Sequence, residues 1–167
     1  MKIITNPAML RKNPRWVTRQ TNLKKLNDSI RRTARALLNT GYGVGLSATQ
    51  VGIDKRFCVV IIQETFDKST VKVFVNPVVI AHSEQTTNDV EGCLSYPNQY
   101  GTVTRYNEIT VKHLDTHEWI QKEEKFYGMN ARVLQHEIDH LDGICCMDKA
   151  RDIFIKELPI VEAGETQ

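Results

Sequence analysis

Two histidines and a glutamate late in the chain have the spacing of a metal-dependent hydrolase. His136 and His140 are four residues apart in an H-E-x-x-H sequence, within a segment of helical periodicity. An α-helix has about 3.6 residues per turn, so both imidazoles project from one face and can share a metal ion. Glu137 lies beside the first histidine and can act on a water at the metal without being a ligand itself. Because the motif has only three fixed residues, a solvated helix face with two histidines is the alternative interpretation.

Two imidazoles leave a divalent metal short of ligands, because a catalytic site usually has three protein ligands and one open position. Cys93 is the candidate for the third ligand. It lies 43 residues before His136, in a turn-like context beside Gly92, where the backbone can approach closely. A thiolate is a strong ligand, and a bound metal deprotonates the thiol. The competing candidates are each expected to be surface or structural residues; they are His82, His113, His117, Glu91 and Asp139.

A divalent cation held by one thiolate and two neutral imidazoles is a mild Lewis acid, so the protein must supply donors to a developing oxyanion. The carboxamide of Gln50 and the backbone N–H of Leu94 are the candidates. A surface glutamine is the alternative interpretation of Gln50. Asp139 and Asp142 flank His140, and each is expected either to orient an imidazole or to face solvent.

The bulk composition indicates one ordinary folded domain. The chain has 167 residues, 41% hydrophobic and 25% charged, and a net charge of +2, which does not argue for nucleic acid or an anionic membrane. No apolar run approaches the roughly 20 residues of a membrane span, and the start lacks a signal peptide, so a reducing cytoplasm is expected. A reducing compartment argues against disulfides. Burial as small hydrophobic residues is therefore expected for Cys58, Cys145 and Cys146. The single domain is predicted to cover residues 1–167, with a frayed tail from about 160.

Hydrophobic periodicity predicts an α+β fold. Apolar spacings of three and four predict a helix over 22–39 and another over 129–141, whose buried stripe includes Met129 and Leu134. Between them, strands are expected over 57–62, 71–75, 102–106 and 109–114, with 78–82 as a possible continuation and a turn at 115–116. Because helix and strand do not alternate regularly, antiparallel sheet is favoured over a doubly wound fold.

Three segments together resemble one family. Gly43–Gln50 resembles the first motif of the peptide deformylases, Glu91–Ser95 is identical to their second, and Gln135–His140 fits their third, extended by Leu141–Gly143. The segments occur in the family's order and at about its spacing. The second and third motifs in combination are specific, whereas H-E-x-x-H alone would not separate this family from metalloproteases.

The resemblance implies a fold of small antiparallel sheets around a central metal-binding helix, with an N-terminal helix. It implies that Cys93, His136 and His140 hold one divalent ion, natively Fe²⁺, although Zn²⁺, Ni²⁺ and Co²⁺ accept the same ligands. Glu137 would activate a water that attacks the formyl group of an N-formylmethionyl peptide, releasing formate during the N-terminal processing of new polypeptides. The family pattern assigns the oxyanion contacts to Gln50 and to the backbone of Leu94. Gly45 would contribute to a peptide-binding strand edge.

Three departures from the family pattern stand out. Ser47 replaces the usual alanine, and Tyr100 replaces an arginine that many members carry near the substrate backbone. The long basic C-terminal helix of some bacterial members is not evident either, which argues against docking at the ribosome exit region through that element. No nucleic-acid or membrane partner is expected. The expected location is the cytoplasm of a bacterial or phage-infected cell, and a mature organellar form is the alternative.

Two other functions compete with deformylation. The first is an H-E-x-x-H metallopeptidase, which would more often take its third ligand after the helix, whereas Cys93 precedes it. The second is a non-catalytic peptide-binding relative, for which an intact Glu137 has little use.

Overall fold

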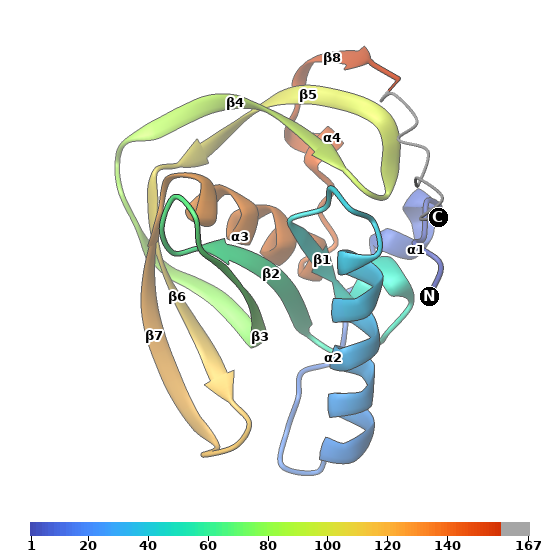
Figure 1. Ribbon diagram of the computed structural model, residues 1–167, viewed down its shortest axis with the longest axis vertical. Helices are drawn as coiled ribbons and strands as arrows, with labels where there is room; N and C mark the ends of the chain where they lie inside the picture. Colours follow the sequence, from blue (N-terminus) through green and yellow to red (C-terminus); the bar gives the residue numbers. More distant parts are fainter. Residues whose placement is uncertain (158–167) are drawn as a thin grey trace, which may run out of the picture.

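A computed structural model describes residues 1–157 of the chain, so the predicted frayed tail falls outside the described residues. Two antiparallel sheets enclose one long helix, α3, and a second helix packs against the outside (Figure 1). Along the chain the elements are α1 (Pro7–Leu10), α2 (Leu23–Leu38), β1 (Gly45–Ser47), the 3₁₀ turn η1 (Ala48–Val51), β2 (Phe57–Gln63), β3 (Ser69–His82), β4 (Thr86–Cys93), β5 (Tyr96–Tyr106), β6 (Glu108–Asp115), β7 (Ile120–Tyr127), α3 (Gly128–Leu141), α4 (Cys146–Lys149) and β8 (Arg151–Ile155). None of the helices in this part of the chain is long and apolar enough to cross a membrane.

The strand pairing confirms the predicted α+β class. One sheet has five strands in the order β1-β2-β3-β6-β7, and the other has three in the order β4-β5-β8. All neighbours are antiparallel, and short turns join β4 to β5 and β6 to β7. The long strand β3 joins the predicted strand 71–75 to its proposed continuation.

The buried position of α3 explains how polar residues come to lie inside the protein. Its apolar face packs on the five-stranded sheet, where Leu134 and Ile138 join Phe74 in one core cluster. The three-stranded sheet lies over another part of the same helix, which it contacts through β5 (Figure 1). Within the helix only Gly128 and Met129, in the first turn, are exposed. The prediction that Met129 is buried is wrong. Its side chain is 61% exposed, because it lies in the first turn of the helix and lines a cavity.

Helix α2 follows the predicted boundaries to within one residue at each end. The side chain of Asn22 accepts a hydrogen bond from the N–H of Lys25 and so caps the first turn. Leu26 and Leu37 are buried in a second apolar cluster that includes Phe57 of β2. The helix therefore supports β1 and β2 from the side opposite α3.

Several elements were not predicted. Strand β4 reads Thr-Thr-Asn-Asp-Val-Glu-Gly-Cys, and of its residues only Glu91 is buried, so it has no apolar alternation to detect. Strand β5 begins at Tyr96, six residues before the predicted start, because it continues the hairpin with β4. The cysteine prediction is confirmed: Cys58, Cys145 and Cys146 are buried and free.

The carboxyl end of α3 is held by a buried arginine. Arg56, which is 6% exposed, donates to the carbonyl oxygen of Leu141 (2.9 Å), to Asp142 (2.7 Å) and to the carbonyl oxygen of Pro77 (3.0 Å). Its guanidinium also lies over the ring of Trp16 at 4.9 Å. A cation satisfies the unpaired carbonyls of a helix end and complements the helix dipole, so Arg56 fixes the turn that carries His140.

We predict that Arg56→Met lowers the free energy of unfolding by about 2–4 kcal/mol, because it leaves buried carbonyl oxygens without donors. Arg15→Met is the matched control. It also removes an arginine–aspartate pair, Arg15–Asp54 at 2.6 Å, but both side chains are exposed, so its cost is expected below about 1 kcal/mol. Urea unfolding of the two variants measures the difference, and equal losses would contradict the assigned role.

Candidate metal and catalytic site

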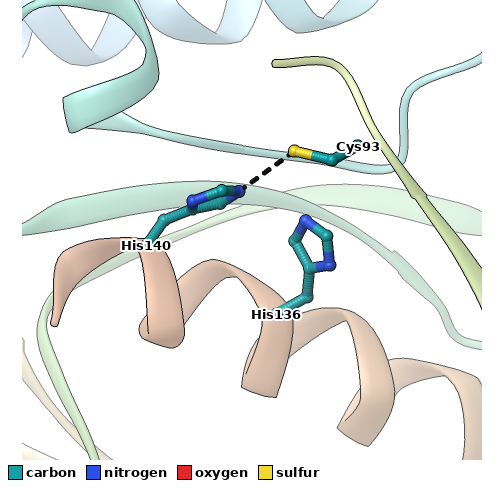
Figure 2. A group of neighbouring side chains, drawn as sticks. All are labelled: Cys93, His136 and His140. Carbon is teal, nitrogen blue, oxygen red and sulfur yellow. Dashed lines mark hydrogen bonds between the residues drawn. The ribbon is translucent and has the colours of Figure 1, made fainter. Parts of the chain in front are cut away.

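Three predicted ligands converge at one point. Cys93 is the last residue of β4, directly before a turn, while His136 and His140 project from consecutive turns of α3 toward it (Figure 2). The sulfur of Cys93 lies 3.2 Å from Nε2 of His140, and one ligand atom from each residue lies within 4.8 Å of the others. Among the described residues no second cluster of this kind is found, so His82, His113 and His117 are not brought to the site.

The donor set fits one divalent transition metal. Ligand atoms that are each about 2.0–2.3 Å from a common ion lie about 3–4 Å from one another. The 3.2 Å between the Cys93 sulfur and Nε2 of His140 is in this range. Burial and the neighbouring His136 lower the pKa of His140, which keeps its imidazole neutral, as a ligand must be. A hydrogen bond with Cys146 and burial raise the pKa of Cys93, so the free thiol is protonated until a cation displaces its proton.

Glu91 is not part of the cluster, but its carboxylate contacts one of the imidazoles. Its Oε2 lies 3.0 Å from Nδ1 of His136, and because a carboxylate only accepts, Nδ1 carries the hydrogen and Nε2 is left to bind. Arg105 donates two bonds of 2.9 Å to the same carboxylate, and Arg132 donates one of 2.7 Å. Burial alone would raise the pKa of Glu91, but the bonds from His136 and Arg105 hold it well below its ordinary value. Sequence reasoning treated Glu91 only as a weak ligand candidate, although its place in the second motif was a signal.

Of the two alternatives for Asp139 and Asp142, the orienting of an imidazole is wrong for both residues, whereas Asp142, with 47% of its side chain exposed, faces solvent as the other alternative expected. Asp139 accepts hydrogen bonds from Arg105 and Lys149, and Asp142 pairs with Arg56. Both carboxylates turn away from the metal cluster because cations on other elements attract them. Nδ1 of His140 is buried and has no hydrogen-bond partner within the part of the chain that is described.

Glu137 is buried beside the ligands without joining them. It is 3% exposed, and burial raises the pKa of its carboxyl group. The hydroxyl of Ser47 lies 2.7 Å from Oε2 and 2.8 Å from the carbonyl oxygen of the same glutamate. A Cβ atom on Gly45 would lie 2.4 Å from Oε1, so only glycine leaves room for this carboxyl group. The arrangement holds a buried carboxyl group next to the predicted metal ligands without making it one of them.

Gln50 is 1% exposed, so its interpretation as a surface residue is wrong. Its Oε1 accepts a hydrogen bond from the N–H of Ser47 at 2.8 Å. That contact turns Nε2 toward Ser95, whose hydroxyl accepts at 3.1 Å, and toward the sulfur of Cys93 at 3.5 Å. The carboxamide N–H groups therefore point at the metal cluster.

These residues open onto a cavity of about 290 Å³ between β1 and the β4–β5 hairpin. Its lining includes Gly45, Leu94, His136 and Glu137. Gly45 belongs to β1, the terminal strand of its sheet, so within residues 1–157 one edge of β1 has no paired strand. Tyr100 also lines the cavity, and its ring stacks on that of Phe154 of β8 with 5.7 Å between the ring centroids. The Tyr100 ring packs closely on Gly92, where an added Cβ atom would lie 2.7 Å from it.

We predict that Glu91→Gln weakens metal binding by roughly tenfold to a hundredfold, because the neutral amide holds His136 less firmly. Glu124→Gln is the control, since Glu124 makes the same kind of contact with His113 (2.7 Å) outside the cluster. Competition with a chelator measures both affinities. Unchanged affinity in the folded Glu91→Gln protein would refute the orienting role.

Known proteins have similar sequences and a similar architecture. The family model described as polypeptide deformylase matches residues 1–154. A peptide deformylase of Natranaerobius thermophilus is 40% identical, with 93% of this chain and 96% of that protein covered. One from Synechocystis is 41% identical, with 76% and 69% covered.

Solved structures agree with these relatives. The peptide deformylase of Thermotoga maritima superimposes with a TM-score of 0.80 at 32% identity, covering 90% of this chain and 97% of the other. A probable peptide deformylase of Synechococcus phage S-SSM7 gives 0.78 at 36% identity, covering 89% and 98%. With the family model matching almost the whole described chain, this protein belongs to the peptide deformylase family.

Proposed function

We propose that the cluster of Cys93, His136 and His140, with Glu137 beside it, is where this deformylase removes the formyl group from N-formylmethionyl polypeptides. The observation that carries the proposal is the convergence of one thiol and two imidazoles next to a buried carboxyl group that opens onto a cavity. Formate and a free methionyl amino terminus are the products.

The three ligands would hold one divalent cation, and we propose Fe²⁺ as the native one. When bound, such an ion supplies Lewis-acid chemistry: it polarises a carbonyl and makes water more acidic. The buried Glu91–His136 contact keeps the second imidazole nitrogen free for it. Zinc, nickel and cobalt suit the same ligands, so the metal found will depend on preparation.

Glu137 would move the proton. With Oε2 engaged by Ser47, Oε1 is the atom left to accept a proton as a water oxygen attacks the formyl carbon. The same carboxyl group would then donate that proton to the amide nitrogen as the carbon–nitrogen bond breaks. Burial raises the pKa of Glu137, which makes it a better base than an exposed glutamate.

Two N–H donors would stabilise the negative charge on the formyl oxygen. Gln50 is held by Ser47 and Ser95 with its Nε2 toward the cluster. Leu94 follows Cys93 in the turn and lines the cavity. Donors that are fixed before the reaction cost no reorganisation when the charge develops.

The substrate backbone would pair with the free edge of β1 at Gly45, in the manner of an added strand. We further propose that residues 1–167 act as one domain, in the cytoplasm where formylated chains are made, without nucleic-acid or membrane partners. An interaction of this protein with the ribosome exit region remains a prediction. Among the described residues, α4 has only four residues and is followed by β8, so no long basic helix is available there for docking.

We predict that the protein, purified without oxygen, releases formate from a short formylmethionyl peptide and that Glu137→Gln lowers kcat at least about a hundredfold, because the amide cannot accept the proton. Glu124→Gln, a half-buried glutamate on β7, should retain activity. Cleavage of internal peptide bonds would instead favour a metallopeptidase. Peptide binding without turnover would favour a non-catalytic relative.

Metal content tests the ligand set separately. We predict that Cys93→Ala purifies with less than about a tenth of the wild-type metal, because two imidazoles alone bind a divalent ion weakly. Cys146→Ala should keep its metal, although that buried thiol neighbours Cys93. Elemental analysis of anaerobic preparations measures both variants and identifies the ion. Loss of metal from both variants, or from neither, would contradict the assignment.

A further inference from the structure

Ser47 contacts two groups of the site through different atoms. Its backbone N–H donates to Oε1 of Gln50 at 2.8 Å, while its hydroxyl faces the Glu137 carboxyl group at 2.7 Å. The residue is completely buried on β1 and does not line the cavity, so it cannot contact substrate. Any effect of Ser47 on catalysis must therefore pass through these neighbours.

Within the described residues, the Ser47 hydroxyl is the single hydrogen-bond partner of the Glu137 carboxyl group. No other hydrogen bond to Oε1 or Oε2 is formed there. A buried carboxyl group with a single partner would rotate if that partner were removed, because nothing else fixes its χ3 angle. On the other side Oε1 of the group lies close to Gly45. One hydrogen bond thus decides which carboxyl oxygen faces the cavity.

We propose that Ser47 is a positioning residue that fixes the Glu137 carboxyl group for proton transfer. The inference rests on the proposed role of Glu137. Because Ser47 does not line the cavity and acts through Glu137, its hydroxyl tunes the rate and is not itself a catalytic group. A small angular error at the proton-transferring atom is enough to slow a reaction whose groups must be aligned.

A purely structural role is the competing explanation. The hydroxyl also lies 2.8 Å from the carbonyl oxygen of Glu137 and joins β1 to α3. Loss of that contact would lower stability without changing the proton-transfer step. The two explanations predict different values of kcat and KM for a variant without the hydroxyl, and a different result for a matched control variant.

Ser47→Ala separates these explanations because it removes the hydroxyl but keeps the N–H that orients Gln50. With a formylmethionyl peptide, kcat is expected to fall about threefold to tenfold, while KM stays within twofold. Bound metal should be unchanged. Thr33→Val is the control: Thr33 is equally buried and donates at 2.9 Å to the carbonyl oxygen of Ser29 in α2, far from the cluster in sequence. It should lower the melting temperature without lowering kcat.

A kcat for Ser47→Ala within twofold of the parent protein would overturn the inference. So would a fall in kcat matched by an equal loss of metal, or an equal fall in kcat for Thr33→Val. The proposed function is tested apart from this, by Glu137→Gln. If that change abolishes formate release and Ser47→Ala has no effect, only the positioning role fails; if Glu137→Gln leaves activity intact, the role of Glu137 itself fails.

Discussion

One buried carboxylate joins the helix that carries His136 and His140 to the sheet that carries Cys93, the proposed third ligand. Glu91 of β4 accepts hydrogen bonds from Arg105 of β5 and from Arg132 and His136 of α3. The four side chains are almost completely removed from water. A buried charge without partners is very costly, so these groups must meet in one arrangement. Cys93 lies two residues further along β4, and its position follows from that arrangement.

The five-stranded sheet completes the site from the opposite direction. The short strand β1 and the turn after it bring Gly45, Ser47 and Gln50 against the side of α3 that carries Glu137. Gly45 leaves room for the Glu137 carboxyl group. The N–H and hydroxyl of Ser47 contact the side chains of Gln50 and Glu137, and the Gln50 carboxamide faces the sulfur of Cys93. The site therefore forms only when both sheets close on the helix, because neither sheet alone carries all of its parts.

This closure has a chemical consequence. Removing water from around Glu137 raises the pKa of its carboxyl group, while the cations around Glu91 hold the pKa of that carboxyl group low. Two glutamates that lie close together thus have opposite tendencies, one suited to moving protons and one suited to fixing an imidazole. Such a separation is typical of sites where acid–base roles are divided by environment. Arg56, at the far end of α3, holds the turn on which His140 depends.

Local chemistry in the sequence was sufficient to predict α2, α3 and the common face of His136 and His140, because helix geometry determines distances over four residues. Residue types and their neighbours also made Cys93 and Gln50 candidates, and the motif resemblance added the peptide deformylase family. Tertiary structure alone decided that Glu91 orients His136, that Asp139 turns to Arg105, and that Met129 is exposed. Such contacts join residues from separate elements, and the spacing along the chain does not determine them. Strand β4 could not be predicted from the sequence for the same reason. Its side chains are mostly polar and mostly exposed, and it is a strand because it pairs with β5.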